Sequence, residues 1–322
     1  MKHSYLLLLT VIFAVGCSPQ LAKDSIEINK ERLLTDLQIL SHDSLEGRGF
    51  GTHGNLKGQK FIEKRFEELG VTAAFESGYS QPFEHTIGGR RRQRAFPIAD
   101  PMEDFSNVPD TTLQGANIAA IIPGKTDRVI VITAHHDHLG IINGKIYNGA
   151  DDDGSGTASL FAMAAYFKAK SLKHTLIFAA VDAEEVGLAG SMYLVDNFPV
   201  SLEKISLNVN LDMISHTDSL KLWATGLYHY PQLRPPLDAI KSPIKLWFGH
   251  DDPNDEELDD WTDNSDHQAF HERKIPFIYF GVDDHVDYHR DTDEYENINP
   301  EFYVEAVKLI IQAIEGYDEM LD

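Results

Sequence analysis

Four short apolar runs along the chain predict buried β-strands, and each ends in acidic or histidine side chains. The runs extend from Val129 to Thr133, His174 to Val181, Ile205 to Leu211 and Phe277 to Val282. Apolar residues at consecutive positions are typical of strands that are covered on both faces. A shorter run, Asn117 to Ile122, predicts a further strand that ends at a Pro-Gly turn.

Helical spacing of apolar residues separates these strands. It predicts helices over Asn29 to Ser41, Leu56 to Leu69, Thr157 to Lys170 and Asn299 to Tyr317. Strands that alternate with helices indicate an α/β fold. We therefore expect three layers, αβα, around a central mixed, largely parallel sheet.

Two segments need a separate interpretation. Gly49, Gly51 and Gly54 match the G-x-G-x-x-G dinucleotide fingerprint, but a helix rather than a strand is predicted before them, so a tight loop is favoured. The region from Ala74 to Thr112 contains four prolines and the basic run Arg90 to Arg92, which we interpret as a solvated hairpin or loop.

The first residues have the pattern of an export signal. Residues 1–16 carry one lysine and an apolar run too short to span a bilayer, followed by small residues. The cleavage region resembles a bacterial lipobox, and Cys17, the only cysteine, stands where a lipid is attached. We expect a signal peptide at 1–16, a tether at 17–30 and one domain at 31–322. The protein would be exported to the periplasm or cell surface as a lipoprotein; an ordinary secreted protein is the alternative.

Composition limits the partners. The formal net charge of −23 disfavours binding to nucleic acids and anionic membranes, since both are polyanions. Contact with a membrane is expected only through a lipid at Cys17. A negative surface would favour substrates with a free amine. With one cysteine, the chain forms no internal disulfide.

The polar residues at the predicted strand ends suggest a metal site. Carboxyl ends of parallel strands meet at one edge of a sheet, where open α/β proteins bind ligands. Imidazole and carboxylate groups without cysteine suit zinc or a similar divalent ion. The candidate ligands, each at or near a strand end, are His135, Asp152, Glu185, Asp212 and His289.

Several other motifs are absent or incomplete. The chain has no H-E-x-x-H and no G-x-S-x-G, which disfavours that zinc protease class and a serine nucleophile elbow. The stretch from Asp151 begins like a calcium-binding EF-hand loop, but Ala162 stands where the twelfth-position glutamate belongs.

Taken together, the ordered motifs resemble the M28 family of co-catalytic zinc peptidases from about Leu45 to the C-terminus. The resemblance rests on AHHD at 134–137, NGADDDGSG at 148–156, AEE at 183–185, NLDM at 210–213, SDHQAF at 265–270 and DYHRDTDEYENIN at 287–299. It implies two zinc ions per chain, although manganese or cobalt would also suit such ligands.

The resemblance also implies a role for each ligand. His135 and Asp212 would bind one zinc, Glu185 and His289 the other, and Asp152 would bridge the two. A water between the ions would be acidified by both.

Other residues would support these ligands. Glu184 would be the general base, and extended backbone would point it away from Glu185. Asp137 would lie behind His135 as a hydrogen-bond acceptor. Asp153 departs from the asparagine usual in the family and adds negative charge behind the ligands. The family also implies a cis Asp152–Asp153 peptide bond.

The implied activity is that of an aminopeptidase acting on peptides with a free N-terminus. Asp153 or Glu184 could accept the substrate ammonium, and Trp247, Phe248, Trp261 and Phe270 could form a side-chain pocket. His136 and His138 are interpreted as supporting or surface residues. The acidic loop 251–260 is interpreted as solvated, with a rim of the cleft as the alternative.

Three other functions remain open. A glutaminyl cyclase shares the fold but has a reduced zinc site, which the intact His135 disfavours. A carboxypeptidase would need a cation to bind the substrate carboxylate, and Arg273 and Arg290 are candidates. A peptide-binding module without catalysis should show broken ligands, whereas all five ligands and Glu184 are present.

Overall fold

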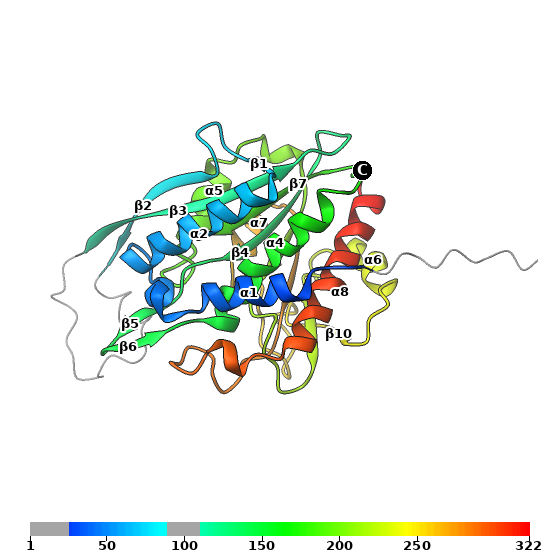
Figure 1. Cartoon of the computed structure of the whole chain (residues 1–322). Coiled ribbons are helices and arrows are strands. Elements are labelled where there is room, and N and C mark those ends of the chain that lie inside the picture. The colour runs from blue at the N-terminus through cyan, green and yellow to red at the C-terminus, as the bar shows by residue number, and fades with distance from the viewer. Residues whose placement is uncertain (1–25, 89–109) are drawn as a thin grey trace, which may run out of the picture.

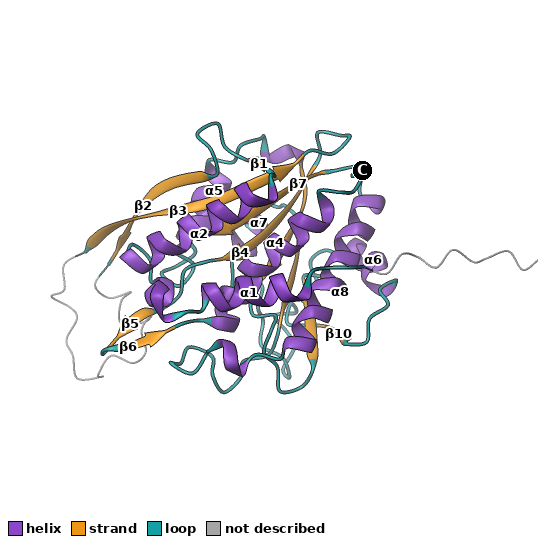
Figure 2. Cartoon of the chain, viewed as in Figure 1, coloured by secondary structure: helices purple, strands orange, loops and turns teal. Residues whose placement is uncertain are grey.

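A nine-stranded mixed sheet forms the centre of the protein (Figure 2). The computed structural model describes residues 26–88 and 110–322. Four strands in the middle of the sheet are mutually parallel and lie in the order β7 (Thr175–Val181), β4 (Val129–His135), β8 (Ile205–Leu211) and β11 (Phe277–Gly281). They coincide with the four apolar runs, and their carboxyl ends share one edge of the sheet.

The outer strands are mostly antiparallel. On one side β3 (Thr111–Ile122) runs antiparallel to β7, and both β1 (Thr72–Ala73) and β2 (Ser80–Ile87) run antiparallel to β3. On the other side β9 (Lys221–Thr225) runs antiparallel to β11, and β10 (Lys245–Phe248) is parallel to β9. The sheet is therefore mixed, as expected, with its parallel strands at the centre.

Helices cover both faces of this sheet (Figure 1). On one face lie α1 (Lys30–Leu40), α2 (His53–Leu69), α4 (Gly156–Phe167) and α8 (Pro300–Met320). On the other lie α5 (Ala189–Asp196) and α7 (His267–His271), while the short α6 (Arg234–Asp238) packs on α8. The predicted three-layer αβα arrangement is confirmed.

Alternation along β4 explains why its sequence is apolar throughout. Ile130 and Ile132 belong to the core under α1, α4 and α8, whereas Val129 and Val131 belong to the core under α5 and α7. Successive side chains of a strand point to opposite faces, so a strand between two helical layers needs apolar residues at every position.

The remaining regular elements are short. They are the 3-10 helices η1 (Asp43–Arg48), η4 (Leu202–Lys204), η5 (Pro231–Leu233) and η6 (Tyr295–Asn297), the turn η3 (Ala150–Ser155), and a hairpin of β5 (Gly140–Ile142) and β6 (Lys145–Tyr147). The hairpin and η3 lie between β4 and α4.

The glycine-rich segment leads into α2. It follows η1 rather than a strand, as the sequence predicted. The Thr52 hydroxyl accepts a hydrogen bond from the Asn55 amide and caps the helix, which ends at Gly70 with a φ of 60°. The helix begins three residues earlier than expected.

Parts of two other predictions lie outside the described residues. These parts are the signal peptide with Cys17 and the basic run Arg90 to Arg92. Lipid attachment stays a prediction that mass spectrometry of membrane-extracted protein would test. Within 26–88 and 110–322, no helix combines the length and apolar character needed to cross a membrane. Ile26 and Ile28, at the end of the expected tether, pack against the core.

Candidate metal centre

The expected ligands meet at the carboxyl edge of the four parallel strands. His135 ends β4, Glu185 and Asp212 follow β7 and β8, and His289 lies in the segment after β11. Asp152 comes from η3, which crosses the same edge before α4 begins. The peptide bond between Asp152 and Asp153 is cis, as expected.

Asp152 lies between two sets of donor atoms. Its Oδ1 is 3.1 Å from His135 Nε2, and its Oδ2 is 3.1 Å from His289 Nε2. Asp212 Oδ1 is 3.5 Å from His135 Nε2, and Glu185 Oε2 is 3.4 Å from His289 Nε2. The five side chains thus form two donor sets that share one carboxylate, which is the arrangement a bridged pair of divalent ions requires.

Strong charge pairing holds these groups together. Burial alone would lower the pKa of His135, but Asp212 and the other nearby carboxylates raise it well above its usual range. Burial would raise the pKa of Asp152, yet the imidazoles of His138, His135 and His289 hold it well below its usual value. Burial opposes the shift of His289 too, but Glu185 and Asp152 raise its pKa to about 11. Divalent ions could take the place of the imidazole protons, since metal ligation requires neutral imidazole.

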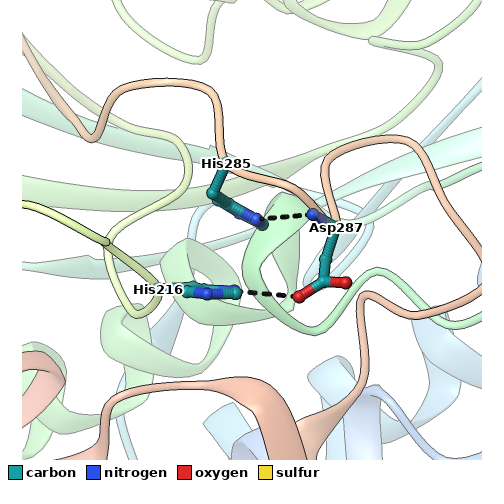
Figure 3. A group of neighbouring side chains, drawn as sticks. All are labelled: His216, His285 and Asp287. Atoms are coloured by element: carbon teal, nitrogen blue, oxygen red, sulfur yellow. Dashed lines mark hydrogen bonds and ion pairs between the residues drawn. The ribbon is translucent and has the colours of Figure 1, made fainter.

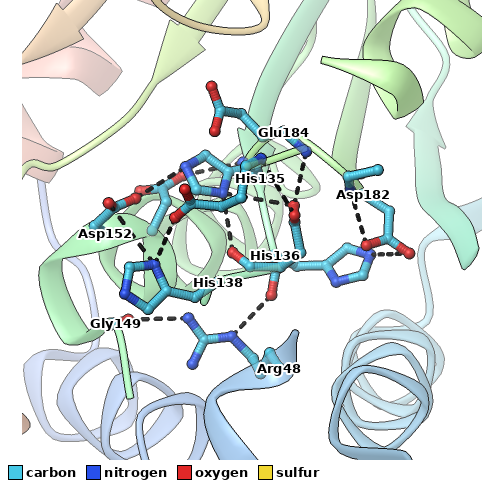
Figure 4. A network of polar contacts seen from close by, with 12 residues as sticks. Arg48, His135, His136, His138, Gly149, Asp152, Asp182 and Glu184 are labelled. Atoms are coloured by element: carbon cyan, nitrogen blue, oxygen red, sulfur yellow. Dashed lines mark hydrogen bonds and ion pairs between the residues drawn. The ribbon is translucent and has the colours of Figure 1, made fainter. Parts of the chain in front are cut away.

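His138 belongs to the second donor set, the one that contains Glu185 and His289. The sequence interpretation did not anticipate this position. It is buried, with Nδ1 2.7 Å from Glu185 Oε1 and 3.7 Å from Asp152 Oδ2 (Figure 4). His136 is also buried, but its Nε2 contacts the Ala116 carbonyl oxygen at 3.0 Å, away from the ligands. The alternation of a strand would place both on the side opposite His135, but β4 ends at His135.

Asp137 supports the centre through two different groups. Its main-chain carbonyl oxygen is 3.0 Å from His135 Nδ1, whereas its carboxylate is 3.7 Å from the same nitrogen. The carboxylate instead accepts hydrogen bonds from the amides of Glu184 and Glu185, at 3.0 and 3.3 Å. Asp137 therefore lies behind His135, as expected, but its side chain orients the turn that carries the two glutamates.

Asp153 is buried behind the ligands and does not face the pocket. Its carboxylate accepts hydrogen bonds from the amides of His135, Gly156 and Met213 at 3.0, 2.9 and 3.2 Å. Burial raises its pKa well above the usual value, despite the attraction of His135. The suggestion that Asp153 accepts a substrate ammonium is therefore wrong, because its carboxylate is fully buried against backbone amides and does not line the pocket.

Glu184 lines the same pocket as the ligands. Its carbonyl oxygen accepts hydrogen bonds from Gly187 and Leu188, so Glu184 and Glu185 lie in a tight turn rather than in extended backbone. Burial raises the pKa of Glu184 well above its usual value, and Glu185 and Asp212 raise it further. In Figure 4 its carboxylate points away from Asp152 and His138. A carboxyl with a raised pKa and no ligand role is suited to proton transfer.

A pocket opens over the centre. Its lining consists of the five expected ligands, Glu184 and Gly187, Leu188, Met213, Trp261, Asp263, Asn264, Tyr279, Val282, Asp284 and Tyr288. Among these described residues there is no lysine or arginine. The pocket can therefore accommodate apolar side chains and cationic groups, but it offers no lysine or arginine side chain to a substrate carboxylate.

Several residues suggested for the substrate site lie elsewhere. Of the four aromatic candidates only Trp261 lines the pocket. Phe270 is buried in the core on the α5 and α7 face, and Trp247 and Phe248 belong to β10. Arg273 pairs with Asp196, and Arg290 is exposed outside the pocket lining.

The acidic loop 251–260 does not line the pocket either. Much of it is solvent-exposed. It is held at one end by Asp251, whose carboxylate accepts hydrogen bonds from Gly226 and Tyr228 at 2.7 and 2.9 Å. The interpretation of this loop as solvated agrees with this placement.

Two residues that the sequence analysis did not identify support the segment around Asp152 through hydrogen bonds to its backbone. Asp293 accepts hydrogen bonds from the amides of Asp151 and Asp152 at 2.9 and 3.0 Å. Arg48 is fully buried and donates to the carbonyl oxygens of Leu40, His136, Asn148 and Gly149 at 2.5 to 2.9 Å (Figure 4). The spacing of apolar residues gives no signal for either, since their partners are backbone groups distant in sequence.

Asp266 gives the metal-free centre a pH-dependent stability. It is fully buried at the start of α7, where the Ser191 side chain lies close to its carboxyl group. Burial raises its pKa from 3.8 to about 7. Because the unfolded chain releases this proton first, stability is lost as the pH rises between these two values. Asp266→Asn should raise Tm of metal-free protein by roughly 5 °C at pH 8 and leave it unchanged near pH 3.5.

The measurement is thermal unfolding by circular dichroism at both pH values. Asp263→Asn is the control, because Asp263 is exposed and its replacement should have no effect at either pH. An equal change in Tm at both pH values for Asp266→Asn would contradict the assignment.

Comparisons with known proteins agree with this geometry. The model of Peptidase family M28 matches residues 117–314, more than half of the chain. Aminopeptidase YwaD of Bacillus subtilis is 29% identical over 201 residues, which cover 58% of this chain and 40% of that protein. Leucine aminopeptidase 1 of Penicillium rubens is 32% identical over 108 residues, covering 31% and 28%. The matches thus span less than half the length of these relatives.

Solved structures of two enzyme types share the fold. The aminopeptidase of Aneurinibacillus sp. strain AM-1 superposes with a TM-score of 0.68 at 17% identity, covering 89% of this chain and 93% of that one. Glutaminyl cyclase of Porphyromonas gingivalis superposes with a TM-score of 0.65 at 16% identity, covering 89% and 98%. At these identities the likeness concerns the fold alone.

Proposed function

Since the chain belongs to peptidase family M28, we propose that it is a metal-dependent aminopeptidase that removes N-terminal residues from peptides. The observation that supports this most is the position of Asp152 between two donor sets, with one oxygen 3.1 Å from His135 and the other 3.1 Å from His289. A site for a single ion would not need both sets.

The donor set fits two zinc ions. In this proposal His135 and Asp212 would hold one ion, Glu185 and His289, with His138 beside them, would hold the other, and Asp152 lies between the two sets. The donors are imidazole nitrogens and carboxylate oxygens, which suit zinc and also manganese or cobalt. Bound zinc would polarise the scissile carbonyl and lower the pKa of a bound water.

Glu184 is the proton carrier in this proposal. Its carboxylate accepts the proton of the attacking water and then donates it to the departing amine. Burial, and then the surrounding acids, raise the pKa of Glu184 well above its usual value. Asp137 holds the turn by bonding the amide of Glu184 at 3.0 Å, so the carboxylate keeps its place at the pocket.

The lining of the pocket supports an amino-terminal rather than a carboxy-terminal substrate. Acidic residues surround it, including Asp263 and Asp284 at its exposed rim, and they favour a substrate ammonium. The side chain of the first residue would contact Leu188, Met213 and Trp261. No lysine or arginine in the lining could pair with a substrate carboxylate.

Glutaminyl cyclase is the second candidate, because solved cyclases share the fold. The presence of the His135 and Asp212 set favours hydrolysis over cyclisation. A cyclase would release ammonia from an N-terminal glutamine and leave other peptides intact.

A peptide assay separates these functions. The purified protein is incubated with matched peptides that carry a free N-terminus, an N-acetyl group or an N-terminal glutamine, with and without a chelator. We expect loss of one N-terminal residue from free peptides only, abolished by chelation and followed by mass spectrometry. Shortening of acetylated peptides from the other end would show a carboxypeptidase, ammonia loss alone a cyclase, and no change a binding module; each would overturn the proposal.

A further inference from the structure

The loops that carry Asp212 and His289 meet a second time at a separate group of metal-binding side chains. This His–His–Asp cluster consists of His216, His285 and Asp287 (Figure 3). One ring nitrogen of each histidine and one carboxylate oxygen of Asp287 lie within 4.8 Å of one another. None of the three lines the pocket over the candidate metal centre.

Hydrogen bonds fix the tautomer of His285. Its Nε2 is 3.0 Å from Asp151 Oδ2. The other oxygen of Asp151 accepts hydrogen bonds from the Ser215 amide and hydroxyl and from the His216 amide, so this carboxylate is an acceptor throughout. Nε2 of His285 therefore donates, and Nδ1 carries the lone pair, which accepts a hydrogen bond of 3.3 Å from the Asp287 amide. A bound ion would take the place of that weak donor at Nδ1. A carboxylate behind a histidine in this way is common where the histidine binds a metal.

His216 presents a nitrogen without a partner. The side chain is about nine-tenths buried, and Nδ1 has no hydrogen bond in the described residues. The nearest acid, Asp287 Oδ2, is 3.7 Å away, too long for a hydrogen bond. A buried polar atom of this kind costs free energy unless a ligand or water satisfies it.

Asp287 and the ring stacking complete the cluster. Thr292 donates a hydrogen bond to Asp287 Oδ1 at 2.5 Å, which leaves Oδ2 directed at His216. The two imidazole rings stack with centroids 3.9 Å apart and 29° between their planes, so both cannot carry a positive charge at low cost. Two neutral imidazoles beside a carboxylate form a donor set for a divalent ion.

We propose that the His–His–Asp cluster binds one divalent transition-metal ion, separate from the ions of the candidate metal centre. Two imidazole nitrogens and one carboxylate oxygen suit zinc, nickel or copper better than calcium or magnesium, which prefer oxygen donors. Waters would complete the coordination. The ion would tie the loop after β8, which carries Asp212, to the loop after β11, which carries His289. The inference goes beyond the proposed function and does not depend on it.

The test counts zinc ions per chain. Metal-free protein is loaded with excess zinc, passed through a desalting column and analysed by inductively coupled plasma mass spectrometry. His216→Asn should bind one ion fewer per chain than the unmodified protein, and so should Asp287→Asn. The difference does not depend on how many ions the candidate metal centre holds or on whether the protein cleaves peptides.

A control and a second measurement keep the outcome clear. His229 and His271 also lie ring to ring, with centroids 4.8 Å apart, but they belong to none of the donor groups of three or more found in the described residues. His271→Asn should therefore leave the zinc count unchanged. Crystals of the unmodified protein, measured at the zinc edge, should show an anomalous peak between His216 and Asp287. An equal zinc count in all variants would overturn the proposal. The crystals hold the unmodified protein, so the absence of a peak at this position would overturn it even if a variant failed to fold.

Discussion

Replacing Glu184 with glutamine should lower kcat on a free peptide by about 10²- to 10⁴-fold and leave the bound metal unchanged. Glutamine keeps the size of the side chain but cannot accept a proton. Glu184 lines the pocket, and it belongs to neither donor set around Asp152. The proposed mechanism therefore predicts that substrate and metal still bind while proton transfer is lost.

The matched control is its neighbour. Glu185→Gln should reduce the zinc content, because Glu185 lies 3.4 Å from His289 and 2.7 Å from His138 in the second donor set. Steady-state kinetics and metal analysis of both variants separate the two roles. If Glu184→Gln kept more than a third of the activity, or lost zinc to the same extent as Glu185→Gln, Glu184 would not be the base.

Arg48→Met should lower the free energy of unfolding by about 3–5 kcal/mol and weaken zinc binding by about 10- to 100-fold. Arg48 is fully buried, and its guanidinium satisfies four backbone carbonyl oxygens. Methionine fills similar space but donates no hydrogen bond, so those carbonyls would be buried without a partner. Two of them, in Asn148 and Gly149, belong to the segment that leads to Asp152.

Urea unfolding followed by fluorescence gives the first quantity, and zinc titration against a competing chelator gives the second. Arg234→Met is the control, because Arg234 is half-exposed and pairs with Asp238 one helical turn away. Its loss should cost less than about 1 kcal/mol. Equal effects of the two substitutions would show that the buried hydrogen bonds of Arg48 contribute no more to stability than an exposed ion pair does.

The centre of the sheet could be predicted because burial on both faces leaves a strong pattern. The run from Ile205 to Leu211 matches β8 at both ends, and the other central strands differ by one or two residues. Of the outer strands, only the second half of β3 was predicted, over Asn117 to Ile122. β9 and β10 have only five and four residues, and β2 contains Pro82, which lies in a strand that pairs only with β3. Short strands at the edge of a sheet carry too few buried residues to produce a pattern.

In the candidate site, too, some residues could be predicted from the sequence and others could not. The five expected ligands were found because each ends or follows a strand, and the structure brings all five together. His138 and Asp293 were missed, since their roles depend on turns whose course the local sequence does not define. Asp153 lies behind the ligands, as the sequence interpretation placed it. Only the suggestion that it binds a substrate ammonium was wrong, because the charge of a residue does not show whether its carboxylate faces a substrate or its own backbone.

The donors around Asp152 come from β4, from η3 and from the segments after β7, β8 and β11, so the ligand atoms come together only when the whole sheet has formed. The unfolded chain offers no comparable site. An ion bound there would shift the folding equilibrium by mass action, by about 4 kcal/mol at a free concentration one thousand times its dissociation constant. Metal binding and folding would then be linked, and a chelator that removes the ion would lower the stability of the entire sheet.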